Sequence, residues 1–142
     1  MRFLLSAQIN NSYIGRSFLL LWRLLDRVIS KKSNHWAFFT HPLKRTQFVE
    51  NSRAVFEQVK GDKGLHKLIF TRGPGVVLDL ECACNTRVIN LQSVAGLYEL
   101  ACCGVWLLTN SISMDLVLRW SDGSRSVPKP VMRGRAIVNL WH

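Results

Sequence analysis

Acidic residues are scarce in this chain of 142 residues, which has 9 Asp and Glu against 19 Lys and Arg and a formal net charge of +10. Cysteine and proline are also rare, with four of each, so the composition excludes a disulfide scaffold and a collagen-like chain. The hydrophobic fraction of 48% excludes disorder as the main state. This length suits one compact domain, with or without an appended segment, better than a two-domain enzyme.

The few cysteines do not have the spacing of a metal or redox site. Cys82 and Cys84 flank a single residue, and Cys102 and Cys103 are adjacent, whereas zinc ribbons and thioredoxin-like sites separate paired cysteines by two residues. Apolar neighbours favour buried, reduced thiols over metal ligands. The sequence therefore predicts no metal and no other cofactor, and reduced thiols fit a cytoplasmic location.

Long hydrophobic runs are also absent. The longest stretch without a charge or glycine in the region 14–29 is Ser17 to Trp22, whereas a membrane-spanning helix needs about twenty mostly apolar residues. No small-residue cleavage site follows the short apolar start of the chain, so we expect no secretory signal. Residues 14–29 are not predicted to span a membrane.

The basic excess is concentrated near the N-terminus, where residues 1–60 carry ten Lys or Arg against Asp26, Glu50 and Glu57. Such an excess suggests an anionic partner, which can be nucleic acid, a phosphate-bearing substrate or anionic lipid. No helix-turn-helix, zinc-finger or RNP-like motif is present and the basic residues are scattered, so nucleic acid is not an expected partner.

Residues 1–34 are predicted as a basic amphipathic segment. Apolar residues recur there at the spacing of one helix face: Ile14, Phe18, Leu21, Trp22, Leu25, Val28 and Ile29. One interpretation is a helix lying in the membrane interface, and the other is an ordinary helix packed on the domain. For the first, the predicted membrane-binding residues are Arg16, Trp22, Arg23, Arg27, Lys31 and Lys32.

Residues 35–142 alternate short apolar runs with helical patterns. We expect strands near 36–40, 67–71, 87–91, 105–109 and 136–141, and helices near 53–60, 76–84 and 93–103, with Asn51 and Ser52 as helix caps. This alternation predicts an α/β fold with a Rossmann-like parallel sheet.

Ligands of such sheets bind at the carboxyl ends of the strands, so the polar residues that follow the strands are the candidate site. These residues are His41, Arg72, Asn110, Ser111 and His142. The glycine-rich phosphate-binding motifs are absent, and Gly73-Pro74-Gly75 is predicted as a turn. Arg72, Lys129 and Arg133 can meet an anionic polymer or can be ordinary solvated charges.

Four segments, taken in order, give the chain a resemblance to a known family. They are Trp36-Ala37-Phe38-Phe39, the stretch Val49 to Glu57, the stretch Gly96 to Ala101 followed by Thr109-Asn110-Ser111, and Asn139-Leu140-Trp141-His142. Together they resemble the N-terminal half of the CDP-glycerol glycerophosphotransferase family, the teichoic acid and capsule polymerases of bacteria. The last segment matches the beginning of the family's Asn-Leu-Trp-His-Gly-x-Pro-x-Lys motif and is the most specific, whereas Glu50 stands where the family usually has Asp.

The resemblance implies that residues 35–142 are the acceptor-side, Rossmann-like domain of a GT-B transferase, truncated before the nucleotide-binding domain. Members of the family move glycerol phosphate, or a related polyol phosphate, from CDP-glycerol to a teichoic acid or capsule-type polymer. They are peripheral proteins at the cytoplasmic face of the cell membrane. The expected partners are therefore a CDP-glycerol-type donor bound through the missing domain, an anionic polyol-phosphate polymer and an anionic membrane surface.

In this interpretation His142 is the base that takes the proton from the acceptor hydroxyl, because imidazole titrates near neutrality. Arg72, Asn110 and Ser111 are the predicted substrate-binding residues, and we expect the chain alone to be inactive as a transferase. Two alternatives stay open. His142 can be a solvated side chain with no role, and the protein can be a non-catalytic module that binds membranes or anionic polymers.

Overall fold

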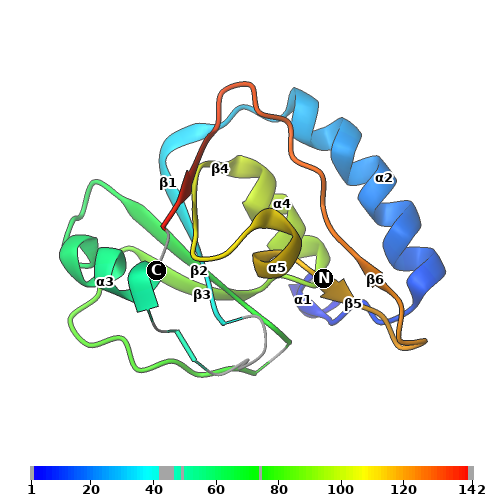
Figure 1. The fold of residues 1–142 in the computed structure, drawn as a ribbon, viewed down its shortest axis with the longest axis horizontal. Coiled ribbons are helices and arrows are strands. Elements are labelled where there is room, and N and C mark those ends of the chain that lie inside the picture. Colours follow the sequence, from blue (N-terminus) through cyan, green and yellow to red (C-terminus); the bar gives the residue numbers. More distant parts are fainter. Residues whose placement is uncertain (1, 42–46, 49, 74, 141–142) are drawn as a thin grey trace.

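The fold is built on a five-stranded parallel sheet with helices on both faces (Figure 1). The computed structural model describes residues 2–41, 47–48, 50–73 and 75–140. The sheet has the strand order β3-β2-β1-β4-β7, and every neighbouring pair is parallel. Its strands are β1 (Lys32–Phe39), β2 (His66–Thr71), β3 (Thr86–Asn90), β4 (Cys103–Leu108) and β7 (Ala136–Asn139). The predicted α/β fold class is confirmed.

Two hydrophobic clusters lie on opposite faces of the sheet because successive strand residues point to opposite sides. Ala37 and Phe39 belong to a cluster that includes residues of helices α2 (Ser12–Val28) and α4 (Val94–Cys102). Phe38, between them, belongs to the other cluster, where it meets Phe56 of helix α3 (Glu50–Val59) edge to face at 5.6 Å. Helix α3 therefore covers one face, and α2 and α4 cover the other.

The strand order reverses between β1 and β4. From β1 the chain moves outward through β2 to β3 and then returns through α4 to β4 on the other side of β1. Such a reversal is a topological switch point, where the loops at the carboxyl ends of the two strands diverge and leave room for a ligand. The fold thus marks the carboxyl ends of β1 and β4 as the first place to look for a site.

Residues 76–84 do not form the expected helix. Leu78 and Leu80, two positions apart, pack against the α3-side cluster, as in an extended chain. Cys82 and Asn85 have positive φ angles of 56° and 48°, a left-handed conformation that ends any helix. The prediction of a helix over residues 76–84 was therefore wrong.

Four short elements were not predicted. Helix α1 (Arg2–Ser6) lies at the start of the chain, and helix α5 (Ile112–Asp115) follows β4. Strands β5 (Leu118–Arg119) and β6 (Arg125–Ser126) form an antiparallel hairpin beside α2 (Figure 1).

Asn11 caps the N-terminus of helix α2, because its side chain accepts hydrogen bonds from the backbone of Tyr13 and Ile14 at 3.0 and 3.1 Å. Its inward face is formed largely by small or polar residues together with Trp22, which is 1% exposed. A Cβ atom on Gly15 would lie 2.2 Å from the ring of Trp120, so only glycine lets the helix approach this closely. Trp22 also donates its indole N–H to the carbonyl of Leu97 at 2.6 Å.

The predicted apolar stripe of this helix is only partly correct. Phe18, Trp22 and Ile29 pack toward the core, whereas the other four stripe residues are exposed: Ile14, Leu21, Leu25 and Val28. Asp26 takes the inward position instead and is 0% exposed. The helix therefore turns several of its apolar side chains to solvent.

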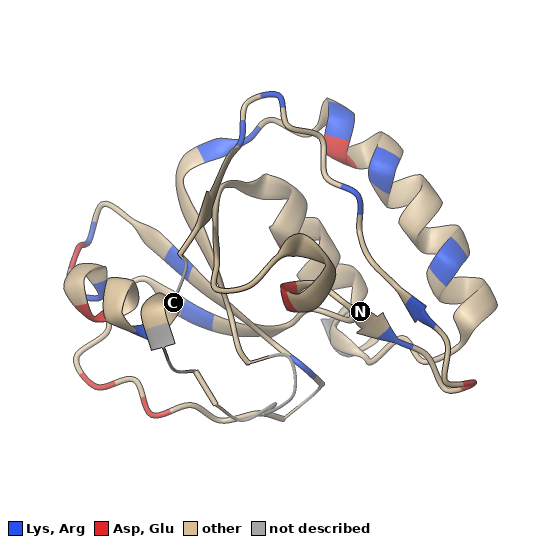
Figure 2. Cartoon of the chain, viewed as in Figure 1, with Lys and Arg blue, Asp and Glu red and all other residues tan. Residues whose placement is uncertain are grey.

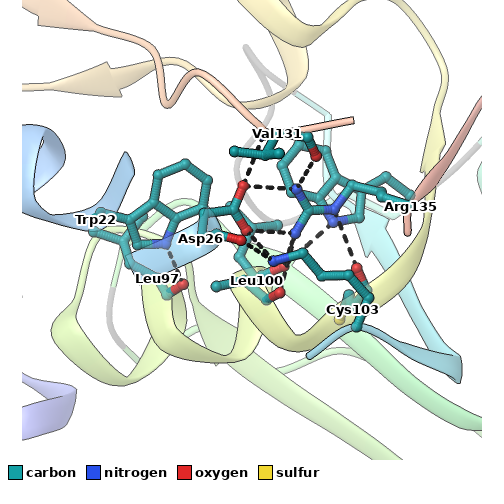
Figure 3. Close-up of polar contacts among 10 residues, drawn as sticks. Trp22, Asp26, Leu97, Leu100, Cys103, Val131 and Arg135 are labelled. Atoms are coloured by element: carbon teal, nitrogen blue, oxygen red, sulfur yellow. Dashed lines mark hydrogen bonds and ion pairs between the residues drawn. The ribbon is translucent and has the colours of Figure 1, made fainter. Parts of the chain in front are cut away.

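Asp26 is held inside by two cations (Figure 3). Arg135 donates to both carboxylate oxygens at 2.7 and 2.8 Å, and Lys31 donates at 2.6 Å. The Arg135 guanidinium lies 4.2 Å from the centroid of the Trp106 ring, and it also donates to backbone carbonyls at the end of α4. Burial alone would raise the pKa of Asp26, but the hydrogen bonds from Arg135 and Lys31 hold it below its ordinary value. This cluster joins α2 to the central sheet.

Candidate functional site at the carboxyl edge of the sheet

The segment that follows β4 meets the first turn of α3. The hydroxyl groups of Ser52 and Thr109 lie 2.7 Å apart, and both residues are buried. Thr40, directly after β1, donates its backbone N–H to the carbonyl of Phe70 at 3.1 Å. Helix α3 begins at Glu50, so Asn51 and Ser52 lie inside its first turn, and the prediction of both as caps was wrong. The hydroxyl of Ser52 instead fixes the N-terminus of α3 at the switch point.

The end of β7 reaches the same place. Asn51 donates its side-chain amide to the carbonyl of Leu140 at 3.0 Å, and the backbone N–H of Leu140 donates to Leu108 at 2.6 Å. Asn139 donates its amide to the carbonyl of Asn110 at 2.8 Å. Residues far apart in the sequence therefore converge at the carboxyl edge. His142, the predicted base, lies outside the described residues.

Asp115 organises the turn after β4. Its carboxylate accepts hydrogen bonds from the backbone and the side-chain amide of Asn110, at 2.9 and 3.1 Å. The hydroxyl of Ser111 accepts the backbone N–H of Met114 at 3.2 Å and caps helix α5. Two predicted substrate-binding residues thus shape the turn, and their contact with substrate stays a prediction. Asp115, which is 2% exposed, was not among the predicted residues, although an acid inside an otherwise apolar stretch was a usable signal.

Arg72, which follows β2, is directed at the C-terminal end of α5. Its guanidinium donates to the backbone carbonyls of Met114, Asp115 and Val117. Burial lowers its pKa to about 10, while the nearby Asp115 carboxylate acts in the opposite direction. Asp115 thereby brings Arg72 and Asn110 together. The other strand-end candidate, His41, is half-buried and donates its backbone N–H to Gln47 at 2.9 Å.

Two hollows lie near these residues and differ greatly in size. The one beside Arg72 has a volume of about 60 Å³, which is the space of one or two water molecules. The other measures about 560 Å³, within the usual range of ligand sites. It is open and mostly apolar, and its polar side chains are those of Ser111, Ser113, Lys129 and Asn139. Hydroxyls, an ammonium and an amide suit a ligand that carries both hydroxyls and phosphate.

The predicted membrane-binding residues divide into two groups. Arg16, Arg23 and Arg27 of α2 are exposed, and so is Lys32 at the start of β1. Trp22 is buried, and the Lys31 side chain is 5% exposed and ion-paired with Asp26. In this fold Trp22 and Lys31 cannot contact lipid. The face of α2 that carries Asp26 is directed into the protein, so Trp22 is buried with it and Lys31 is held by the Asp26 carboxylate. No helix within the described residues is both long and apolar enough to cross a membrane.

The cysteines follow the expectation of buried thiols only in part. Cys102 and Cys103 are buried, whereas Cys82 is exposed. Burial raises the pKa of the Cys103 thiol well above its ordinary value. The part of the chain that the structure describes contains no group of three or more His, Cys, Asp or Glu side chains placed to hold a metal ion.

No family model, no curated protein and no solved structure matches this chain. Its function is therefore inferred from the residues and from their geometry.

Proposed function

We propose that this protein is the acceptor-side domain of a transferase that moves glycerol phosphate, or a related polyol phosphate, onto an anionic polymer. The observation that carries the proposal is the convergence of three segments of the family resemblance. Ser52 meets Thr109 at 2.7 Å, and Asn51 meets Leu140 at 3.0 Å. The three segments thus lie at the edge where ligands of parallel sheets bind.

The polar groups at this edge suit the proposed acceptor. Ser111 and Asn139 can hydrogen-bond polyol hydroxyls, and Lys129 can pair with a phosphate in the hollow of about 560 Å³. In a GT-B arrangement, a second domain would bring CDP-glycerol to face this edge. His142, shortly after Leu140 in the sequence, is the proposed base for the attacking hydroxyl, since an imidazole is half-protonated near neutral pH.

We also propose that the protein lies at the cytoplasmic surface of the cell membrane, with α2 toward the lipid. The outer face of this helix carries Tyr13, Leu20 and Val28, which are 80%, 72% and 77% exposed, and Leu21 and Leu24 are exposed beside them. Arg16, Arg23 and Arg27 accompany this apolar face. Apolar area together with cations is the combination that holds a helix in the interface of an anionic membrane.

A non-catalytic module that binds membranes or anionic polymers is the second candidate. The exposed apolar face of α2 favours it, because membrane binding needs no catalytic residue. Release of CMP from CDP-glycerol by the chain joined to a CDP-binding domain of the family separates the two candidates, since only the transferase cleaves the donor.

Titration of a soluble glycerol phosphate oligomer into the protein tests acceptor binding. We expect Lys129→Gln to weaken binding about fivefold, since one cation near a polyphosphate contributes roughly 1 kcal/mol. Lys63→Gln is the matched control, because it removes the same charge from an exposed loop that lies outside the hollow. Equal affinity of both variants would contradict the proposed acceptor site.

A further inference from the structure

A second groove runs between α2 and the segment after β6. On the helix side it is lined by Arg16, Leu19, Leu20 and Arg23, which follow the i, i+3, i+4, i+7 spacing of one helix stripe. On the other side it is lined by Ser126, Val127 and Lys129, and its volume is about 350 Å³. Figure 1 shows this segment running alongside α2, and Figure 2 shows basic residues on both.

The two walls of the groove are fixed to each other at both ends. At one end the indole N–H of Trp120, whose ring lies against Gly15, donates to the hydroxyl of Ser126 at 2.9 Å. At the other end Asp26 of the helix accepts the backbone N–H of Val131 at 2.8 Å. Pro128 and Pro130 flank Lys129, and each fixes one backbone dihedral angle. The groove is therefore formed before any ligand arrives.

The charges of the groove are unbalanced. Arg16, Arg23 and Lys129 contribute three cations, and none of them forms an ion pair within the described part of the chain. The carboxylate that acts on Arg16 is that of Asp122, which is engaged by hydrogen bonds from Ser124 and Ser12. An anion would meet three cations there, with several N–H donors available from the two guanidinium groups.

The floor and one rim of the groove are apolar. Leu19 and Val127 are half-buried and pack on the core, which gives a firm hydrophobic base. Leu20 is 72% exposed and leads from the groove to Leu24, which is 58% exposed on the outer face of α2. A ligand that carries a phosphate and a hydrocarbon chain would use both parts: the phosphate between the cations and the chain along the leucines.

We propose that this groove binds the phosphate headgroup of an anionic membrane phospholipid. The inference rests on the proposed location of α2 at the membrane and deepens it, because it replaces a diffuse attraction with a defined site for one lipid at a time. Charge complementarity and the continuity of the groove with the outer apolar face select a lipid rather than a free phosphate.

Binding to vesicles tests this site through Arg23, because Lys129 also borders the hollow at the carboxyl edge. The probes are vesicles of phosphatidylcholine alone and vesicles of equal parts phosphatidylcholine and phosphatidylglycerol. We expect binding only to the second kind. Arg23→Gln should weaken it about fivefold or more, as expected for one lost cation.

Arg27→Gln is the matched control. Arg27 is an exposed arginine one turn further along the same helix and lies outside the groove, so its loss should weaken binding less than the loss of Arg23. Equal losses would show diffuse attraction and overturn the headgroup site while leaving membrane association intact. No binding of the unaltered protein to either vesicle would overturn both.

Two further outcomes concern other occupants. Soluble glycerol 3-phosphate should not displace the protein from vesicles, because it has no hydrocarbon chain to contact Leu20 and Leu24. Displacement by glycerol 3-phosphate would assign the groove to a free phosphate. The protein should also elute as a monomer in gel filtration without lipid, and a dimer that Arg23→Gln dissociates would assign the groove to a second copy of the chain.

Discussion

Replacing Asp26 by alanine should destabilise the protein more than almost any other single change. Asp26 is 0% exposed and neutralises Arg135 and Lys31, whose side chains are 0% and 5% exposed. Alanine would leave two buried cations with one carboxylate fewer, and the backbone N–H of Val131 would lose its acceptor. Breaking a buried pair in this way costs about 3–5 kcal/mol.

This loss is large compared with the total stability of a domain, which is about 5–15 kcal/mol. It corresponds to a fall in melting temperature of about 10–15 °C for a chain of this size. Urea unfolding monitored by circular dichroism gives the midpoint and the slope. We expect the midpoint to fall at an unchanged slope, since the surface exposed on unfolding stays similar.

Two further variants separate the ion pair from a general effect of substitution. Asp79→Ala removes an exposed carboxylate for which the described residues show no ion pair, so it should change stability by about 0.5 kcal/mol or less. Replacing Asp26, Lys31 and Arg135 together with Leu, Met and Met should restore much of the loss, because an apolar cluster has no charge to desolvate. A loss below about 1 kcal/mol for Asp26→Ala would refute this account of the cluster.

The same carboxylate makes stability depend on pH. Its pKa in the folded protein lies below the ordinary value of 3.8, so the folded state binds the proton less readily than the unfolded chain. Its stabilisation is complete above the ordinary value and is lost as the pH falls from there through the lower folded pKa. The urea midpoint should therefore decrease on acidification through this window, and Asp26→Ala should remove that part of the decrease.

Three other predictions concern helix α2 and the cysteines. Gly15→Ala should destabilise the protein by about 1–3 kcal/mol in the same urea assay, because the added Cβ would lie 2.2 Å from Trp120. Gly61→Ala is the control and should be tolerated, because a Cβ there meets no atom within 4 Å. A thiol reagent should label exposed Cys82 long before buried Cys103, because burial raises the pKa of the Cys103 thiol. Equal labelling rates of the two thiols in mass spectrometry would contradict the described burial. Neutralising Arg16, Arg23 and Arg27 together should release the protein from anionic vesicles, and unchanged sedimentation would show that α2 does not face lipid.

The sequence was sufficient for the fold class because its strands are short apolar runs with clear ends. Lys67 to Thr71, for example, is followed by a glycine and proline turn, and its residues fall within β2 as expected. The extended stretch around Leu78 and Leu80 was missed because the local sequence pattern does not indicate the left-handed backbone of Cys82 and Asn85. The orientation of α2 was missed because it depends on Arg135, which is remote in the sequence from Asp26.

The candidate site was predictable to a similar extent. The rule that ligands bind after parallel strands selected Arg72, Asn110 and Ser111 from their positions in the sequence alone. The rule could not reveal that Asp115 joins Arg72 and Asn110, because the order of the strands does not determine such tertiary contacts. The pairing of Ser52 with Thr109 was hidden for the same reason, because a serine near a helix start is equally typical of a cap.

Release of CMP from CDP-glycerol, in the presence of membranes that carry the acceptor, tests the central claim most directly. The resemblance assigns donor binding to a second domain, and holding donor and acceptor together can supply about 7–11 kcal/mol of the barrier. We predict no CMP release by the 142-residue chain alone, release by the same chain joined to a CDP-binding domain of the family, and loss of that release on His142→Ala. Rapid CMP release by the chain alone, or an active His142→Ala in the joined protein, would contradict the proposed function.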